Sequence, residues 1–318
     1  MPAMAMILPF NRPSFEETTG FSDPVEALAA ADGNGVLAVI TGVEGPSYLP
    51  VGACMSFLAD GRRVGSLSSG CIEADLHLHA AAALDRGKPV CVRYGKNSPF
   101  FDIRLPCGGT LDILMVPRPQ LVLLNRTIEL RKARQPHALA FDLSRGLSHV
   151  SQFRPTGTEN GMFYAAIRPE PRFLIFGKGP ETLVFAGLVH SAQLPCLVLS
   201  HDEETLQQAE LSAIPVRYIG RKGLPTDIAV DRWTAAALFY HDHDYEPPIL
   251  AQLLKTDAFY IGAQGSRAAR DARLRALSEA GMCDADLSRL HGPIGLIPSA
   301  RDPRTLAISV LAEILSVL

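Results

Sequence analysis

The sequence predicts an α/β protein with two domains, an N-terminal α+β domain and a C-terminal domain built on a mostly parallel sheet. Before residue 168, short apolar runs are separated by tight-turn residues, which is typical of strands joined by hairpins. After residue 172, apolar strands alternate with helix-length segments, which indicates a parallel sheet with crossover helices. Between them, Arg168-Pro-Glu-Pro-Arg172 has the composition of a stiff linker. We therefore expect domains at 1–168 and 169–318.

Composition restricts the class of protein further. The 318 residues are 47% hydrophobic and 20% charged, which fits folded domains and argues against general disorder. The net charge of −3 offers no basic surface for nucleic acid. No run approaches the roughly 18 apolar residues of a membrane-spanning helix, and the apolar start lacks the positive cluster of a signal peptide. The six cysteines stand singly, so we expect reduced thiols and a cytoplasmic location.

In the first domain we expect several short strands and two helices. Strands are predicted at 36–41, 53–58 and 63–67, with Asp60-Gly61 as the hairpin turn. A helix is predicted after Cys71, because Glu73 and Asp75 lie in its first turn, where the helix dipole favours acids. Further strands are expected at 89–94, 111–116, 137–143, 150–153 and 162–167, and a helix at 121–133.

In the second domain, Phe173-Leu-Ile-Phe176 runs directly into Gly177-Lys-Gly179, and a helix is expected to follow through Ala192. Strands are then expected at 196–199, 235–240 and 258–261, with helices at 203–209, 248–254, 266–280 and 303–317. The strand runs are apolar throughout, as in strands buried on both faces of a sheet. This half is therefore predicted to be a Rossmann-like domain.

Two cysteines lie among glycines, in Ser69-Gly-Cys71-Ile-Glu73 and in Pro106-Cys-Gly-Gly109. A thiolate at the start of a helix is stabilised by the dipole, as expected for Cys71, and the turn at Cys107 has amides that can face an anion. The alternative is that both are small buried hydrophobes. Their glycine context favours a functional role, whereas Cys54, Cys91, Cys196 and Cys283 are expected to be buried and inert.

The turn Gly177-x-Gly179-x-x-Thr182 lies between a strand and a helix, as a dinucleotide-binding turn requires. The third glycine of that fingerprint is replaced by Thr182. The acid that binds ribose hydroxyls is expected near Ser200, so Asp202 is a displaced candidate for this role. A turn that keeps the fold without a nucleotide is the equal alternative.

Two further segments lie at the carboxyl ends of predicted parallel strands, where such sheets bind ligands. His241 and His243 share one face of an extended segment and are candidates for a ligand cleft, with helix capping as the alternative. Gly265, Ser266 and Arg267 combine amides, a hydroxyl and a guanidinium, as an anion site does, or they form a turn and an N-cap.

Taken together, these segments resemble the XdhC/CoxI family of accessory factors for xanthine dehydrogenase and related molybdenum hydroxylases. The resemblance covers most of the chain in order, and its most specific part joins Gly-Ser-Arg267 to Pro293-Ile-Gly-Leu296 and Ala312-Glu313. The other matching motifs are Gly45-Pro-Ser-Tyr-Leu-Pro-Val-Gly-Ala53, Gly65-Ser-Leu-Ser-Ser-Gly-Cys-Ile-Glu73, Cys107-Gly-Gly109, Ile175-Phe-Gly-Lys-Gly179 and His241-Asp-His-Asp244. The chain departs from the family at Leu49, Ser69, Pro180 and Ser200, where arginine, glycine, histidine and an acid are usual.

The resemblance implies a protein that binds molybdenum cofactor (molybdopterin), supports its sulfuration with a cysteine desulfurase, and delivers it to a xanthine dehydrogenase-type hydroxylase. Such a protein is a binding and delivery factor rather than a turnover enzyme. Cys71 and Cys107 match the family's two glycine-flanked cysteines and are the candidates for contacting molybdenum or relaying sulfur. Gly70, Gly108 and Gly109 frame them, and Glu73 is expected to orient Cys71 or a pterin amine. Gly265, Ser266 and Arg267 would hold a phosphate.

Two other interpretations remain open from the sequence. One is an NAD(P)-dependent oxidoreductase that uses the altered turn at Gly177 and Gly179, and the other is a scaffold that docks a dehydrogenase without any ligand. The apolar C-terminal helix fits either a core or the surface of a homodimer.

Overall fold

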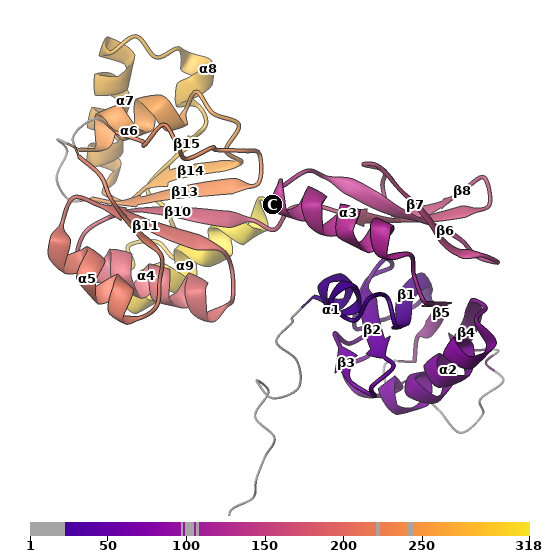
Figure 1. The fold of residues 1–318 in the computed structure, drawn as a ribbon. Helices are drawn as coiled ribbons and strands as arrows, with labels where there is room; N and C mark the ends of the chain where they lie inside the picture. The colour runs from indigo at the N-terminus through magenta and orange to yellow at the C-terminus, as the bar shows by residue number, and fades with distance from the viewer. Residues whose placement is uncertain (1–22, 97, 99–104, 106–107, 221–222, 241–244) are drawn as a thin grey trace, which may run out of the picture. The chain divides into compact units, whose positions relative to one another are not determined.

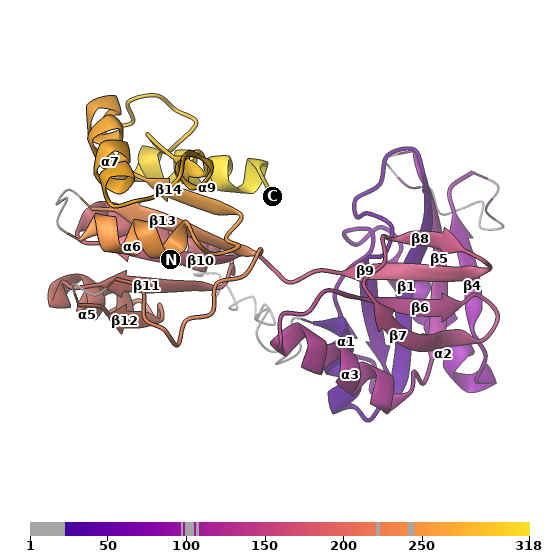
Figure 2. The same ribbon diagram turned by 90° about the horizontal axis from the view of Figure 1, so that it is seen from above.

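The computed structural model describes residues 23–318 apart from 97, 99–104, 106–107, 221–222 and 241–244. The chain divides into two compact units, the first ending at Pro169 and the second comprising Glu170–Leu318 (Figures 1 and 2). The predicted fold class is confirmed, because antiparallel sheets make up the first unit and a parallel sheet makes up the second. No helix among the described residues is long and apolar enough to cross a membrane.

The first unit contains a five-stranded antiparallel sheet. Its strands lie in the order β3 (Arg63–Val64), β2 (Cys54–Leu58), β1 (Gly35–Glu44), β5 (Thr110–Pro117) and β4 (Val90–Tyr94). The turn predicted at Asp60-Gly61 joins β2 to β3, and Gly61 has a positive φ of 90° that glycine adopts without strain.

Both faces of this sheet are covered, because side chains of β1 alternate between two cores. Val36, Ala38 and Ile40 face helix α2 (Glu73–Arg86), which packs on one side. Leu37 and Val39 face the other side, toward α1 (Pro24–Ala30) and α3 (Leu121–Lys132).

A second antiparallel sheet completes the first unit. Its strands lie in the order β7 (Gly146–Gln152), β6 (His137–Asp142), β9 (Met162–Ile167) and β8 (Gly157–Glu159). Leu139, Phe141 and Phe163 of this sheet pack into the same core as Leu37 and Val39. The two sheets of this unit are therefore joined by one apolar layer.

The second unit is a six-stranded parallel sheet. Its order is β12 (Val216–Tyr218), β11 (Cys196–Ser200), β10 (Arg172–Gly177), β13 (Thr234–Phe239), β14 (Tyr260–Ala263) and β15 (Leu290–His291). In chain order this is 3-2-1-4-5-6, the order of the Rossmann fold, with the ligand crevice expected where β10 meets β13.

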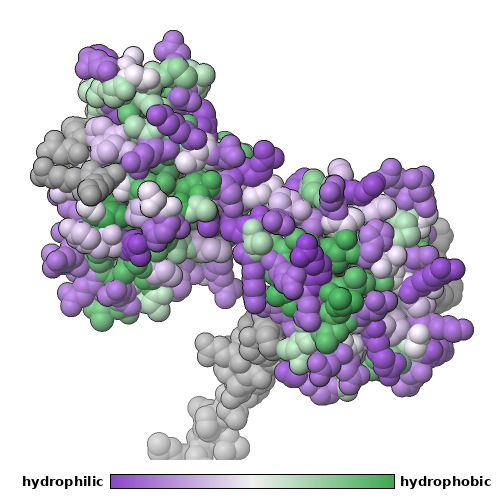
Figure 3. Space-filling model, turned by 45° about the horizontal axis from the view of Figure 1, so that its top comes forward, coloured by the Kyte–Doolittle hydropathy of each residue, from purple (hydrophilic) through white to green (hydrophobic). Residues whose placement is uncertain are grey.

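Helices cover both faces of this sheet (Figure 1). Helices α4 (Pro180–Ser191), α5 (Glu203–Leu211) and α9 (Pro303–Ser316) pack with Ile175 and Phe239 on one face. Helices α6 (Glu246–Leu253) and α7 (Arg267–Glu279) pack with Phe176 and Leu238 on the other, and α8 (Asp284–Leu287) follows α7. On the face drawn in Figure 3, hydrophobic residues of each unit are bordered by hydrophilic ones.

Candidate functional site

The Cys71 thiol lies at the surface of the first unit, immediately before helix α2. Cys71 is exposed, and the helix begins two residues later at Glu73. The preceding loop contains Ser69 and Gly70, both with positive φ values, of 60° and 100°. Glycine is the usual residue for such a backbone, so Ser69, where the related family has glycine, adopts a conformation that is uncommon for an L-residue.

Glu73 holds this loop in place. Its side chain is buried, and both carboxylate oxygens accept hydrogen bonds from the loop that carries Cys71. Oε1 accepts from the Ser66 hydroxyl at 2.7 Å, the Leu67 amide at 3.0 Å and the Ser68 amide at 2.8 Å. Oε2 accepts from the Ser68 hydroxyl at 2.5 Å, the Gly70 amide at 2.9 Å and the Ile72 amide at 3.2 Å.

The charge of Glu73 is fixed by these contacts. Burial raises the pKa of Glu73, but the hydrogen bonds from Ser68 and Ser66 and from the Ser68 and Leu67 amides outweigh burial and lower it to about 2. An ionised, fully bonded carboxylate therefore holds the loop that carries Cys71, while a role of Glu73 in orienting the Cys71 thiol itself stays a prediction. The same bonds occupy four amides of this loop, those of Leu67, Ser68, Gly70 and Ile72.

Tyr94 joins the start of α2 to the edge of the sheet where β4 ends. Its hydroxyl donates a 2.5 Å hydrogen bond to Asp75 in the first turn of α2. The next residue, Gly95, has a φ of 93°, and a side chain there would lie 2.9 Å from the Cα of Thr110. The Lys96 amide also donates to the Thr110 hydroxyl at 3.1 Å. The Cys71 helix is thus tied to the beginning of β5.

The segment after Cys107 lies at this same edge. Cys107 is outside the described residues, but Gly108 and Gly109 lead directly into β5 at Thr110. Gly109 packs against the backbone oxygen of Pro46, so a side chain at this position would clash with the loop after β1. Gly109 therefore permits close approach of two loops, while the role of Gly108 and Gly109 toward a ligand stays a prediction.

The remaining described cysteines differ in exposure. Cys54 and Cys196 are partly buried, and burial raises the pKa of the Cys54 thiol to about 12, so this thiol is inert as expected. Cys91 and Cys283 are exposed, which contradicts the expectation that they are buried. Cys91 lies on the edge strand β4, and the Cys283 thiol contacts Asp286 at 3.2 Å.

The turn between β10 and α4 has the backbone of a nucleotide-binding turn, but its groups have partners in the protein. Gly177 and Gly179 have φ values of 153° and 78°. The Gly179 amide donates to the Thr205 hydroxyl at 3.0 Å. Thr182 is completely buried beneath Gly177. The Thr182 side chain therefore fills the space that the third glycine of the fingerprint would leave open.

Asp202 lies beside this turn as the N-cap of α5. Its carboxylate accepts from the Thr205 amide at 2.9 Å and hydroxyl at 2.5 Å. A cavity of about 360 Å³ borders the turn, and its charged lining residues are Asp202 and Glu204. The negative charges of these two carboxylates disfavour the binding of a phosphate in this cavity. The role of Asp202 in binding ribose hydroxyls stays a prediction.

The third predicted site follows β13 in the sequence. His241 and His243 are outside the described residues. The flanking Tyr240 and Tyr245 form a stack with His201, whose ring is 3.7 Å from that of Tyr245 with an interplanar angle of 2°. The sequence did not indicate this stack, because His201 follows a different strand.

The fourth predicted site, between β14 and α7, is built on a buried ion pair. Gly265, Ser266 and Arg267 are exposed, and the Ser266 hydroxyl caps α7 by accepting from the Ala269 amide at 3.1 Å. Beneath them, Arg273 binds Glu246 through two hydrogen bonds of 2.9 and 3.0 Å and donates to the Gln264 carbonyl at 3.0 Å. The contacts of Ser266 and Arg273 thus hold this loop in place. Phosphate binding by Gly265, Ser266 and Arg267 stays a prediction.

The motif around Pro293 and Glu313 is explained by packing. The Glu313 carboxylate accepts a 2.8 Å hydrogen bond from the Tyr260 hydroxyl and a second bond from the Gly295 amide. The Tyr260 ring stacks on His291 at 4.5 Å and lies over Gly262, where a Cβ would come within 2.6 Å of the ring. This motif therefore joins α9 to the parallel sheet.

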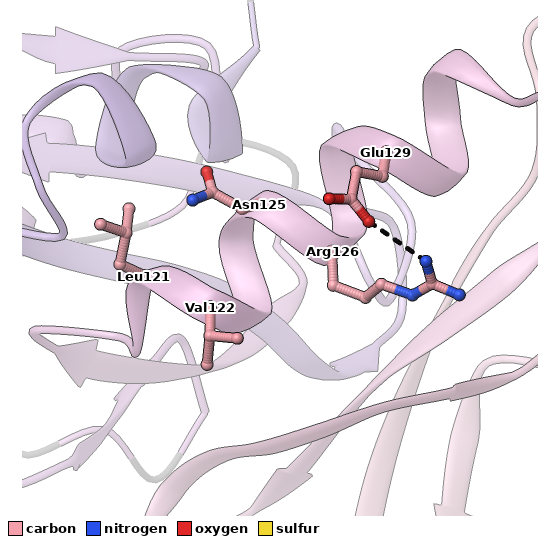
Figure 4. Close-up of a pocket in the computed structure, with 5 residues that line it drawn as sticks. All are labelled: Leu121, Val122, Asn125, Arg126 and Glu129. Carbon is pink, nitrogen blue, oxygen red and sulfur yellow. Dashed lines mark hydrogen bonds and ion pairs between the residues drawn. The ribbon is translucent and has the colours of Figure 1, made fainter.

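Two further kinds of candidate site in the described chain are a group of metal-ligating side chains and a second cavity. Among the described residues, no group of three or more His, Cys, Asp or Glu side chains is arranged to hold a metal ion. A cavity of about 460 Å³ lies along α3, where the lining side chains fan out around the helix and Arg126 pairs with Glu129 (Figure 4). These side chains do not converge on a ligand as a binding site requires.

The chain is similar to known proteins in both units. Residues 28–95 match the family described as XdhC and CoxI, and residues 173–314 match the XdhC Rossmann domain. The molybdenum cofactor insertion chaperone PaoD of Escherichia coli (strain K12) is 33% identical over 298 residues, which cover 92% of this chain and 86% of PaoD. The chain therefore belongs to the XdhC and CoxI family, as its motifs indicated.

Two further relatives agree with this assignment. A probable xanthine dehydrogenase subunit from Bacillus subtilis (strain 168) is 25% identical over 336 residues, covering 93% of this chain and 96% of that protein. A crystal structure described as a xanthine dehydrogenase from Bacillus halodurans has a TM-score of 0.75 at 23% identity, over 92% of this chain and 94% of that one. At this identity the structure shows the same fold.

Proposed function

We propose that this protein binds molybdenum cofactor and delivers it to a molybdenum hydroxylase of the xanthine dehydrogenase type. The observation that carries the proposal is the 33% identity to a molybdenum cofactor insertion chaperone over 92% of the chain. The loop geometry at Cys71 supports it, since an exposed thiol is held on an ordered loop by Glu73. Soft thiolates suit molybdenum, so Cys71 is the group that we assign to the metal end of the cofactor.

We also propose that Cys71 and Cys107 relay the sulfur that a cysteine desulfurase supplies for the cofactor. A thiolate of this chain attacks the outer sulfur of the desulfurase persulfide, so that a new S–S bond forms on this chain while the old S–S bond breaks and the desulfurase cysteine leaves as a thiolate. The end of β4, the start of β5 and the start of α2 meet at one edge of the first sheet, through Tyr94 and Thr110. This arrangement supports a shared site for the Cys71 loop and the segment at Gly108 and Gly109. Sulfur transfer is testable by incubating the protein with a desulfurase and ³⁵S-cysteine, with label expected on wild type and lost from Cys71→Ala.

The NAD(P)-dependent oxidoreductase is the alternative that the Rossmann strand order favours. The contacts at the turn weigh against nucleotide binding, because the Gly179 amide already donates to the Thr205 hydroxyl and two carboxylates line the adjoining cavity. Ser200, where an acid is usual, is fully buried.

The experiment is a pair of titrations on the purified full-length protein, one with molybdenum cofactor and one with NADPH. We expect cofactor binding by wild type and weaker binding by Cys71→Ala. Cys283→Ala is the matched control, because it removes an exposed thiol from the second unit. Binding of NADPH without binding of molybdenum cofactor would favour the alternative.

A further inference from the structure

The first turn of α2 carries a second carboxylate whose surroundings differ from those of Glu73. Glu73 is 6% exposed, and its two oxygens each accept three hydrogen bonds from the protein. Glu73 therefore has no room for a ligand N–H, although the sequence suggested this role for it. Asp75, two residues later, has a side chain that is 24% exposed.

Asp75 is held by two partners that both contact the same oxygen. The Tyr94 hydroxyl donates to Oδ2 at 2.5 Å, and the His79 ring nitrogen Nε2 lies 3.3 Å from Oδ2. Burial and then the hydrogen bond to Asp75 raise the pKa of Tyr94, so its phenol remains a donor. Within the part of the chain that the structure describes, these contacts leave Oδ1 of Asp75 for an external donor.

An apolar surface lies beside this carboxylate. Leu78 is 67% exposed, and it is three residues after Asp75, so the two are neighbours on the helix surface. Ala74, one turn before Leu78, is also exposed. Cys71 is one turn before Asp75. A fixed carboxylate and an exposed apolar side chain near a thiol are together suited to a flat ring that carries N–H donors.

On the basis of the proposed function, we propose that Asp75 binds the ring of the ligand, with Oδ1 accepting a hydrogen bond from the amino group of a 2-amino-4-oxopyrimidine ring and Leu78 packing against that ring. The ring occurs in pterins, including that of molybdenum cofactor, and in guanine. Tyr94 and His79 are positioning residues, because they fix Oδ2. Hydrogen bonds to an ionised carboxylate are about twice as strong as neutral ones, which favours a ring with the amino group.

The test compares two metal-free rings that differ in one group. 6-Hydroxymethylpterin has the 2-amino donor, whereas 6-hydroxymethyllumazine has an oxygen acceptor at that position. In fluorescence titrations, we expect wild type to bind the pterin at least about tenfold more tightly than the lumazine, the scale set by one hydrogen bond of about 1.4 kcal/mol. Asp75→Asn should bring the two affinities within about twofold of each other, because the amide offers both a donor and an acceptor.

Three controls separate the roles of the residues. Leu78→Ala should weaken the binding of both rings by a similar factor and keep the preference for the pterin over the lumazine. Tyr94→Phe should weaken the binding of the pterin about threefold to tenfold, because the Asp75 side chain loses one of the two contacts that hold it. Tyr260→Phe removes a hydroxyl that is also bonded to a carboxylate, but in the second unit, and should leave both affinities unchanged.

GMP in the same assay identifies the source of the ring. Binding of the pterin with no comparable binding of GMP supports a pterin ligand, and stronger binding of GMP would overturn that assignment. Equal binding of pterin and lumazine by wild type, no binding of the pterin, or an unchanged preference in folded Asp75→Asn would each overturn the role of Asp75. The proposed function fails separately, if wild type does not bind molybdenum cofactor.

Discussion

Ser68 donates two hydrogen bonds to Glu73, from its amide to Oε1 at 2.8 Å and from its hydroxyl to Oε2 at 2.5 Å. A charged acceptor makes such bonds strong, and the low exposure of both residues shields them from water. The pair closes the loop that presents Cys71. The residues around this cysteine therefore set the shape of the loop. The shape of the loop in turn sets the position of the Cys71 thiol.

Replacing the carboxylate should loosen this loop. In Glu73→Gln, an amide NH₂ replaces one oxygen and faces donors that it cannot accept from, so we expect the unfolding free energy to fall by about 2 to 3 kcal/mol. Urea denaturation followed by circular dichroism measures the change. Glu129→Gln, at an exposed position on α3, is the control and should shift stability by less than about 0.5 kcal/mol. Equal stability of the two variants would contradict the role of Glu73.

The same carboxylate should make the first unit sensitive to acid. The pKa of Glu73 is lowered in the folded state from 4.5 to about 2, so its contribution is complete above pH 4.5 and is lost as the pH falls from 4.5 toward 2. We expect this contribution to be on the order of 2 kcal/mol. Stability measured across this pH range should fall less steeply in Glu73→Gln than in wild type, and parallel curves would show that Glu73 is not responsible.

Removing one member of the buried ion pair should destabilise the second unit. The Arg273 and Glu246 side chains are 3% and 1% exposed. Arg273→Met leaves a buried carboxylate without its guanidinium partner, which costs about 3 to 5 kcal/mol. Trp233, the single tryptophan, lies in this unit, so its fluorescence reports the unfolding transition.

The double variant tests whether the cost comes from the buried charge of Glu246 after its guanidinium partner is removed. Glu246→Leu with Arg273→Met removes both charges, and we expect it to regain most of the lost stability. A double variant that is no more stable than Arg273→Met would instead indicate that the contact between Arg273 and the Gln264 carbonyl is what matters.

Two glycine substitutions should have opposite effects on the second unit. A Cβ at Gly262 would lie 2.6 Å from the Tyr260 ring and 2.7 Å from Ile294, so Gly262→Ala should lower stability by about 1 to 3 kcal/mol. Gly187 lies within α4 with no atom within 4 Å of the added carbon, so Gly187→Ala should raise stability by about 0.5 to 1 kcal/mol. Thermal unfolding followed by Trp233 fluorescence compares them. A stabilising Gly262→Ala would contradict the close packing on Tyr260.

Periodicity predicted much of the fold because the longer elements are regular. The α4 helix and the apolar strands β10 and β13 were predicted within a few residues. The missed elements are short, such as α1, with seven residues, and β12, with three, and a window this short contains too few repeats to define a period. These short elements are also stabilised by contacts with residues that are distant in sequence, and no local pattern reveals such contacts.

The candidate site was predicted less completely for the same reason. Local sequence placed Glu73 beside Cys71, since the two are close in the chain. It did not indicate that Tyr94 bonds to Asp75 or that Tyr260 bonds to Glu313, 53 residues away. The exposure of Cys91 was also missed, because an apolar neighbourhood in sequence does not fix which strand forms the edge of a sheet. The exposure of Cys283 was missed because this residue precedes the short helix α8, which the sequence did not predict.

The most direct test of the central claim is the affinity of the full-length protein for molybdenum cofactor, measured for wild type, Cys71→Ala and Cys283→Ala in parallel. We expect wild type and Cys283→Ala to bind equally, and Cys71→Ala to bind at least about tenfold more weakly, a change of about 1.4 kcal/mol. Equal binding by all three would show that the Cys71 loop is not the cofactor site, and no binding by wild type would contradict the proposed function itself.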